Sequence, residues 1–183
     1  MAQLQISGNV KIGHVYECDF GLFKKETPSH PNDLATSNKF EASEKDYNYR
    51  IPNELVKKRA VVVIGKHGGQ YIVVPISSTM ETHKKAHKVP EVMGIHIRLL
   101  EVDMPITLRY TKEKARWAKS NLVTTVDGGR LRDVFDQATR KSIPAHPVSA
   151  KTLEQIRYGV ILSIGMPHLI PVDASEAATQ IRD

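Results

Sequence analysis

The chain has 183 residues, 40% hydrophobic and 25% charged, which is typical of a folded globular domain and excludes a disordered or collagen-like chain. Its 26 Lys and Arg against 20 Asp and Glu give a net charge of +6, and its single cysteine, Cys18, excludes an intrachain disulfide and a four-cysteine zinc site. Because no apolar run approaches the roughly 20 residues of a membrane helix and the N-terminus lacks a signal-peptide pattern, we expect a cytoplasmic protein with one domain over residues 1–183.

The positive charge is concentrated in the middle of the chain. Residues 57–144 carry 17 basic and 8 acidic side chains, a net charge of +9, whereas residues 1–56 and 145–183 carry −2 and −1. Such a basic segment is typical of a face that binds anions, with phosphate as the obvious candidate. A lysine-rich solvated surface would give the same pattern, so charge alone leaves both interpretations open.

The first predicted element is a half-buried strand within residues 10–20, where side chains alternate with a period of two before Gly21. Residues 23–50 are polar and show no period. A connection of this length is uncommon inside a compact domain, so we expect it to be functional, partly disordered or ordered against a partner. One hypothesis is therefore a structural or regulatory protein that docks a partner on this segment.

A β-hairpin is predicted next, because two β-branched runs, 60–64 and 71–76, flank a glycine-rich stretch. Neither run alternates with polar residues, which indicates strands buried on both faces. Further strands are expected within residues 93–102 and over residues 121–126, the latter stopping at Asp127.

A single helix is expected over residues 149–166, followed by a tail at 168–183. Ser149 is a candidate N-cap, and Gly159 inside the helix predicts close packing against a neighbouring element. One apolar stripe is formed by Leu153, Ile156, Val160 and Ile164. Short antiparallel strands with long connections and a terminal helix favour a mainly β (α+β) fold with a small antiparallel barrel over a parallel sheet.

The usual signals of nucleotide hydrolysis and lipase chemistry are absent, since no glycine-rich phosphate loop and no G-x-S-x-G motif occurs. His83 and His87 have the i, i+4 spacing of metal ligands on a helix. Their neighbours Lys84, Lys85 and Lys88 would repel a cation and no third ligand is near, so we favour a basic loop over a metal site.

A sharper candidate site is the edge of the predicted hairpin. Arg59 begins the first strand, behind Lys57 and Lys58, and three hydroxyls, Ser77 to Thr79, follow the second strand. Because the strands are antiparallel, these groups meet at one edge. A guanidinium with hydroxyl donors suits a phosphodiester, although such residues are also ordinary neighbours of turns.

Three motifs occur in a fixed order: GHVYECDF at 13–20, RAVVVI at 59–64 with VPISS at 74–78, and WAKSNLVTTV at 117–126 with RL at 130–131. Together they resemble the PemK/MazF family of toxins from type II toxin-antitoxin systems, over residues 10–166. The resemblance implies an SH3-like antiparallel barrel with long inserted loops and a C-terminal helix. It also implies a homodimer that cleaves single-stranded RNA (mRNA) sequence-selectively without cofactor or metal, silenced by a cognate antitoxin protein.

The resemblance further implies that a 2′-hydroxyl attacks the adjacent phosphodiester. Arg59 matches the family's arginine and would stabilise the developing charge, and Glu54 matches an acidic residue five places earlier that transfers a proton or orients Arg59. Ser77 would bind the scissile phosphate, and Lys119 falls where some members carry the arginine of an Arg-x-Asp motif. The remaining candidates for substrate binding are Ser78, Thr79, Asn121, Lys57, Lys58 and Trp117.

Two of these positions leave alternatives open. Asn121 replaces the carboxylate of Arg-x-Asp and cannot act as a general base, so a non-catalytic RNA- or protein-binding module on the same fold is the alternative function. Trp117 lies within a basic strip, where it would be a stacking platform for bases or a core anchor.

Overall fold

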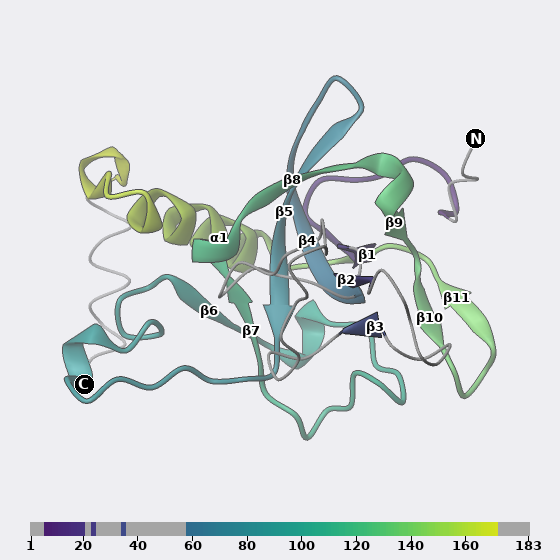
Figure 1. The fold of residues 1–183 in the computed structure, drawn as a ribbon, viewed down its shortest axis with the longest axis horizontal. Coiled ribbons are helices and arrows are strands. Elements are labelled where there is room, and N and C mark those ends of the chain that lie inside the picture. The colour runs from purple at the N-terminus through teal and green to yellow at the C-terminus, as the bar shows by residue number, and fades with distance from the viewer. Residues whose placement is uncertain (1–5, 21–22, 25–33, 36–57, 172–183) are drawn as a thin grey trace.

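The structure, a computed structural model, describes residues 6–20, 23–24, 34–35 and 58–171 (Figure 1). One eight-stranded sheet has the order β12-β1-β4-β5-β7-β6, with β8 also pairing with β5 and β9 with β1, and every one of these pairings is antiparallel. Its strands are β1 (His14–Asp19), β4 (Lys58–His67), β5 (Gln70–Ser77), β6 (His96–Leu99), β7 (Arg116–Lys119), β8 (Thr124–Asp127), β9 (Leu131–Arg132) and β12 (His146–Pro147). Two small antiparallel pairs complete the strands: β2 (Phe23–Lys24) with β3 (Leu34–Ala35), and β10 (Val134–Asp136) with β11 (Lys141–Ile143).

The predicted hairpin is confirmed and is longer than the sequence pattern indicates. β4 and β5 are joined by Gly68 and Gly69, whose φ values of 54° and 83° lie in the left-handed region. Two consecutive positive φ values are what a tight two-residue hairpin turn requires, and glycine adopts them without a steric penalty.

The central strands are buried on both faces, as predicted. On one side, which we call the helix face, Val62, Val74 and Ile76 pack with Ile156 of the C-terminal helix. On the other, which we call the far face, Val61, Val63 and Val73 pack with other apolar side chains: Tyr16, Cys18, Val126 and Leu131. Side chains thus alternate between two apolar cores along the same strand.

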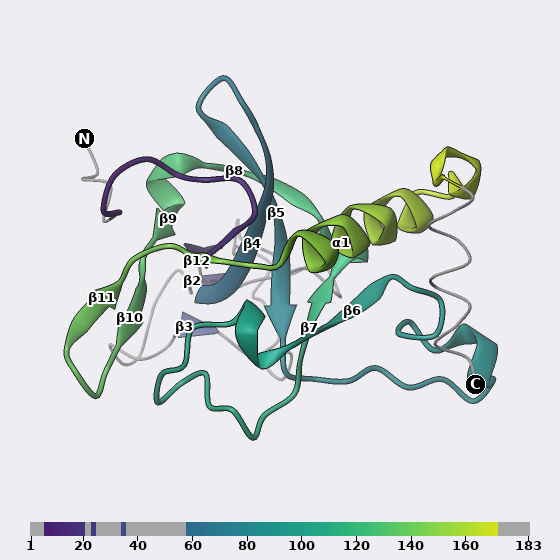
Figure 2. The same cartoon turned by 180° about the vertical axis from the view of Figure 1, so that it is seen from behind.

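The C-terminal helix, α1, spans Ala150–Ser163 and contacts β6 (Figure 2). Ser149 is its N-cap, and its Oγ accepts a hydrogen bond from the backbone N–H of Thr152 at 3.2 Å. The predicted end at residue 166 is wrong: Ile164 lies beyond the helix and is 58% exposed, because the chain turns at Gly165 with a φ of 76°.

The predicted strand over residues 121–126 is only partly correct. Residues Ser120–Leu122 form a 3-10 turn, η3, and β8 begins at Thr124. The turn forms because Ser120 is tied on two sides: its N–H donates to the Ile95 carbonyl at 2.9 Å and its Oγ donates to the Ile156 carbonyl at 3.1 Å. The other 3-10 turns are η1 (Ala86–Lys88), η2 (Glu101–Asp103), η4 (Gly128–Arg130) and η5 (Pro167–Leu169).

The mainly β (α+β) fold with one C-terminal helix is confirmed. The sheet is open rather than closed into a barrel, since β12 and β6 lie at opposite ends of the strand order and do not pair in the part of the chain that the structure describes. Within the same residues, no helix is both long and apolar enough to cross a membrane. Apart from β2 and β3, the long segment 23–50 lies outside the described residues.

Candidate functional site

A row of polar and aromatic side chains crosses the far face near the end of β5. In an antiparallel sheet, directly opposite residues point to the same side. Ser77 lies opposite Trp117, and Trp117 lies opposite Arg98 on β6. The β4–β5 register, with Val61 opposite Pro75, places Ser77 opposite Arg59 when it is continued by two residues. We call these four residues, Arg59, Ser77, Trp117 and Arg98, the Arg59 row.

Arg59 is half-buried at the start of β4 and lies opposite Cys18, a far-face core residue. Its Nε is buried and has no hydrogen-bond partner among the described residues. Burial lowers the pKa of Arg59, and the neighbouring charge of Arg109 lowers it further. A half-buried guanidinium with an unsatisfied Nε–H gains from an anionic ligand that would accept a hydrogen bond and compensate its charge.

The three predicted hydroxyl residues, Ser77 to Thr79, lie at the end of β5. Ser77 and Ser78 are half-buried and Thr79 is exposed. Ser77 Oγ accepts a hydrogen bond from the Thr79 N–H at 3.2 Å, which leaves the Ser77 hydroxyl proton available to a ligand.

Trp117 is 8% exposed, and its indole N–H is buried without a hydrogen-bond partner in the described part of the chain. A ring so deeply covered offers little surface for base stacking. Its burial favours the core-anchor interpretation over the stacking platform.

Beside the Arg59 row lies a second polar group, which we call the His96 cluster: His96, Lys119, Glu81 and Asn121. His96 lies opposite Lys119 in the β6–β7 register, and both side chains are buried. Lys119 Nζ donates to Glu81 Oε1, and His96 Nε2 lies 2.9 Å from Asn121 Oδ1 and 4.0 Å from Glu81 Oε2. Burial is the main cause of a lowered pKa at His96. Lys119 and Asn121 are therefore brought together, but as partners of Glu81 and His96.

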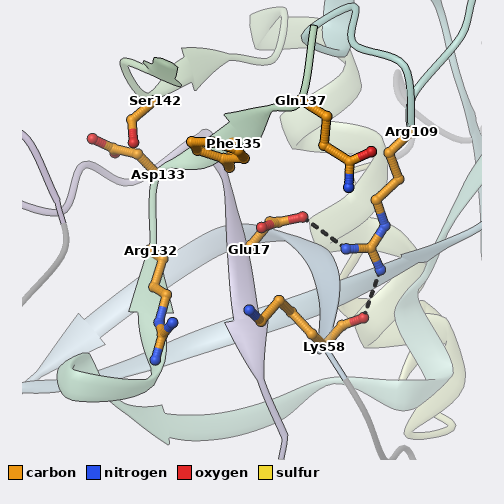
Figure 3. Close-up of a pocket in the computed structure, with 8 residues that line it drawn as sticks. All are labelled: Glu17, Lys58, Arg109, Arg132, Asp133, Phe135, Gln137 and Ser142. Atoms are coloured by element: carbon orange, nitrogen blue, oxygen red, sulfur yellow. Dashed lines mark hydrogen bonds and ion pairs between the residues drawn. The ribbon is translucent and has the colours of Figure 1, made fainter. Parts of the chain in front are cut away.

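A separate pocket of about 270 Å³ opens at the end of β1 (Figure 3). Glu17 lies at its centre, and Glu17 Oε1 accepts hydrogen bonds from Arg109 Nη1 at 2.9 Å and from the Tyr110 hydroxyl at 3.1 Å. Arg109 also donates from Nη2 to the Lys58 carbonyl at 2.9 Å. The pocket is lined by Glu17, Lys58, Arg109, Arg132, Asp133, Phe135, Gln137 and Ser142.

The Tyr110 ring holds the wall of this pocket in place. The guanidinium carbons of Arg116 and Arg109 lie 5.0 and 5.5 Å from its centroid, and Arg116 Nη2 donates to the Arg109 carbonyl at 3.1 Å. Burial, followed by the Glu17 charge, raises the pKa of the Tyr110 phenol. Tyr110 therefore remains a neutral hydrogen-bond donor to Glu17.

The chain is similar to YifN, an uncharacterized protein of Escherichia coli (strain K12), with 32% identity over 130 residues that make up 70% of this chain and 75% of YifN. The chain belongs to the same protein family as YifN. An uncharacterized protein of Haemophilus influenzae is also 32% identical, over 131 residues that cover 71% of this chain and 74% of that protein. No family model matches the chain. Among solved structures, a crystal structure of MazF from Deinococcus radiodurans is similar with a TM-score of 0.45 and 13% identity, covering 87% of this chain and all of that one.

For this relative of YifN, the structure separates two neighbouring predicted residues. Lys58 lies opposite Asp19 and lines the pocket on the helix face, whereas Arg59 points to the far face. Glu54 and Lys57 lie outside the described residues.

Three polar residues of the Arg59 row and the His96 cluster escape the sequence analysis, although two of them lie in a predicted strand, and the pocket around Glu17 was not predicted either. His96 and Arg98 lie on the same side of the strand predicted within residues 93–102, but nothing in that segment indicates that β7 is its partner. No sequence pattern marks Glu81 as a site residue, because its role comes from a contact with Lys119, 38 residues away.

The two histidines with metal-ligand spacing are exposed and do not form a helix together. His87 lies in η1, and His83 Nδ1 accepts the Lys85 N–H at 3.0 Å. No group of three or more His, Cys, Asp or Glu side chains that could hold a metal ion occurs among the described residues.

Proposed function

We propose that the protein is a metal-independent endoribonuclease of the PemK/MazF toxin type that cleaves single-stranded RNA in the cytoplasm. The observation that carries the proposal is the Arg59 row, because two guanidinium groups and a hydroxyl share one sheet face at about 5 Å per strand. Such a spacing lets neighbouring donors contact one phosphodiester or two successive ones. The second and third of the sequence motifs that resemble the family contribute three of the four residues, Arg59, Ser77 and Trp117.

In the proposed reaction, the RNA 2′-hydroxyl attacks the adjacent phosphorus and the 5′ oxygen of the next nucleotide leaves. The products are a 2′,3′-cyclic phosphate and a 5′-hydroxyl. Arg59 would stabilise the charge that develops on the phosphoryl oxygens, since its buried Nε lacks a partner in the described chain. Ser77 would donate a hydrogen bond from its hydroxyl to an oxygen of the scissile phosphate, and the exposed Arg98 would bind a flanking phosphate.

Proton transfer is assigned to Glu54, which matches the family's acidic residue. Lys119 and Asn121 are not assigned to it, because Lys119 is paired with Glu81 and the Asn121 carbonyl faces His96. Instead, these two residues would position β7 and its end beside the Arg59 row. As in the family it resembles, the protein would act as a single-domain homodimer silenced by a cognate antitoxin.

Incubation of the full chain with single-stranded RNA in EDTA tests this function. We expect fragments with 5′-hydroxyl ends, and a loss of about 100-fold or more in rate for Arg59→Ala, since removing one transition-state donor typically costs this much. Arg157→Ala, which removes an exposed arginine from α1, is the matched control and should cleave at the wild-type rate. Cleavage unaffected by Arg59→Ala, or fragments with 5′-phosphate ends, would contradict the mechanism.

A second candidate function is RNA binding without cleavage on the same face. It is favoured by the His96 cluster. Lys119 and Asn121 stand where some family members carry the acid and base of Arg-x-Asp, but here they are partners of Glu81 and His96. Binding of the RNA that weakens steeply with salt, with no product over hours, would identify this function. In that case Arg59→Ala and Arg98→Ala should each reduce the number of counterions released on RNA binding by about one, as measured by the slope of the logarithm of the binding constant against the logarithm of the salt concentration.

A further inference from the structure

The pocket around Glu17 is not used by the proposed cleavage, because it lies on the other side of the sheet. Glu17 lies opposite Ala60 and Arg132, and Ala60 belongs to the helix-face core. Arg59 lies opposite Cys18, in the far-face core. The pocket and the Arg59 row therefore share strand β4, where Lys58 and Arg59 point to opposite faces, and Arg109 of the pocket is the charge that reaches Arg59.

Two cations of the pocket, Lys58 and Arg132, form no ion pair with another described residue, although Asp19 lies opposite Lys58 and Glu17 lies opposite Arg132 in the sheet. Arg109, in contrast, is compensated by Glu17 at 2.9 Å. In Figure 3 the Lys58 amino group and the Arg132 guanidinium lie on the same side of Glu17, away from Arg109. This side of the pocket is suited to an anionic group.

The opposite rim carries an aromatic ring. Phe135 on β10 is 46% exposed, although a phenylalanine gains free energy from burial. Figure 3 places it between Asp133 and Glu17, with the Gln137 amide directed toward the centre of the pocket. An exposed ring beside hydrogen-bonding side chains is the usual arrangement for stacking and reading a nucleobase.

Asp133 supplies an unsatisfied acceptor. Its carboxylate is 4% exposed, and Oδ2 accepts the Ser7 N–H at 2.8 Å, whereas Oδ1 is buried with no hydrogen-bond partner in the described part of the chain. Together with Glu17 it places two carboxylates around the pocket. These charges disfavour a bare inorganic anion and favour a ligand that carries both an anionic group and hydrogen-bond donors.

We propose that this pocket binds one nucleotide, with the phosphate between Lys58 and Arg132 and the base stacked on Phe135. Gln137 and Ser142 would bind the polar edge of the base. A pocket of about 270 Å³ lies just below the usual range of about 300–1,000 Å³ for ligand sites, so it suits a single nucleotide rather than a dinucleotide. The nucleotide is either free or part of an RNA strand, and the proposal does not require that the protein cleaves RNA.

Isothermal titration of the full chain with the four 5′-nucleoside monophosphates, with adenosine and with inorganic phosphate tests the proposal. At least one monophosphate should bind tenfold or more tightly than either adenosine or phosphate. Phe135→Ala and Arg132→Gln should each weaken this binding by roughly tenfold, as expected for losing a stacking ring or a phosphate contact. Lys141→Gln removes an exposed charge on β11 outside the pocket and should leave binding unchanged.

Phosphate that binds as tightly as every monophosphate, or monophosphate binding that is equal in Phe135→Ala and wild type, would overturn the proposal. Thermal melts check that the exposed Phe135 can be replaced without unfolding. A single-stranded RNA pentamer identifies the source: if Phe135→Ala weakens the pentamer as well, the site takes a nucleotide of a strand, and if it weakens only the monophosphate, the site takes a free nucleotide. Arg59→Ala should abolish cleavage but retain monophosphate binding, which separates failure of this site from failure of the proposed function.

Discussion

His96 Nε2 and Asn121 Oδ1 lie 2.9 Å apart although 25 residues separate them in the chain. Asn121 is exposed, whereas His96 is buried between β7 and the turn that Asn121 belongs to. With the Asn121 oxygen as acceptor, Nε2 of His96 carries the proton. The pair thus fixes one tautomer of a buried histidine next to Lys119.

Acid should destabilise the protein through His96. Its pKa is lower in the folded protein than in the unfolded chain because of burial, so the unfolded state binds the proton first. The contribution of neutral His96 is complete above the unfolded pKa of about 6.5 and is lost as the pH falls below it. Urea unfolding between pH 7.5 and 5 should show a falling midpoint for wild type and a flatter one for His96→Gln. His168→Gln, which replaces an exposed histidine, should keep the wild-type slope.

Removing Glu81 should destabilise the protein by about 1–2 kcal/mol. Lys119 is almost fully buried and its charge is compensated by Glu81, so Glu81→Gln leaves a buried cation without its anion. The effect stays moderate because Glu81 is itself 46% exposed. Glu101→Gln breaks an exposed pair with Lys112 at 3.8 Å and should change the free energy of unfolding by less than about 0.5 kcal/mol. Equal effects of the two substitutions in urea unfolding would refute the role assigned to Glu81.

Gly159→Ala should cost about 1–3 kcal/mol even though alanine favours helix formation. A Cβ at this position would lie 2.6 Å from Ser120 Oγ and 2.9 Å from the Gly94 carbonyl oxygen. The free-energy cost of this clash exceeds the gain of about 1 kcal/mol from the higher helix propensity of alanine. Adding Ser120→Ala should restore only part of the loss in a chemical unfolding experiment, since the backbone carbonyl of Gly94 stays in place.

Asp103→Asn should lower the free energy of unfolding by about 2–3 kcal/mol. The buried carboxylate accepts the Ser149 N–H at 2.7 Å and the Thr152 hydroxyl at 2.8 Å, and it ties η2 to the start of α1. An amide nitrogen would face one of these donors and leave it unsatisfied. Asp127→Asn changes an exposed turn in which Oδ1 accepts the Gly129 N–H, and its cost should stay below about 1 kcal/mol. Similar losses for both variants in thermal and urea unfolding would contradict this assignment.

The elements that the sequence predicts well are those specified by neighbouring residues. The β4–β5 hairpin follows from two β-branched runs around consecutive glycines, and the start of α1 follows from Ser149 and its apolar stripe. The close packing of Gly159 was also predictable, because a glycine inside a helix is costly unless a neighbour requires it.

The candidate sites are less predictable, because they depend on contacts across strands. The register that places Arg98 opposite Trp117 joins segments whose order in the sheet no local pattern reveals. The η3 turn replaces the expected start of a strand because Ser120 bonds to Ile156 on α1, a tertiary contact that overrides the β-branched run after it. Similarly, Glu17 is a polar position of an alternating strand, and only the folding of Arg109 and Tyr110 over it forms a pocket.

The alternation of Lys58 and Arg59 has a consequence for how this family can diverge. The two residues are adjacent in sequence but face opposite sides of one strand. A substitution at either position changes the ligand chemistry of one face and leaves the other face intact. In contrast, a one-residue slip in the pairing of β4 with β1 and β5 would turn both side chains to the other face at once, so the register of this strand keeps the two ligand chemistries on separate faces.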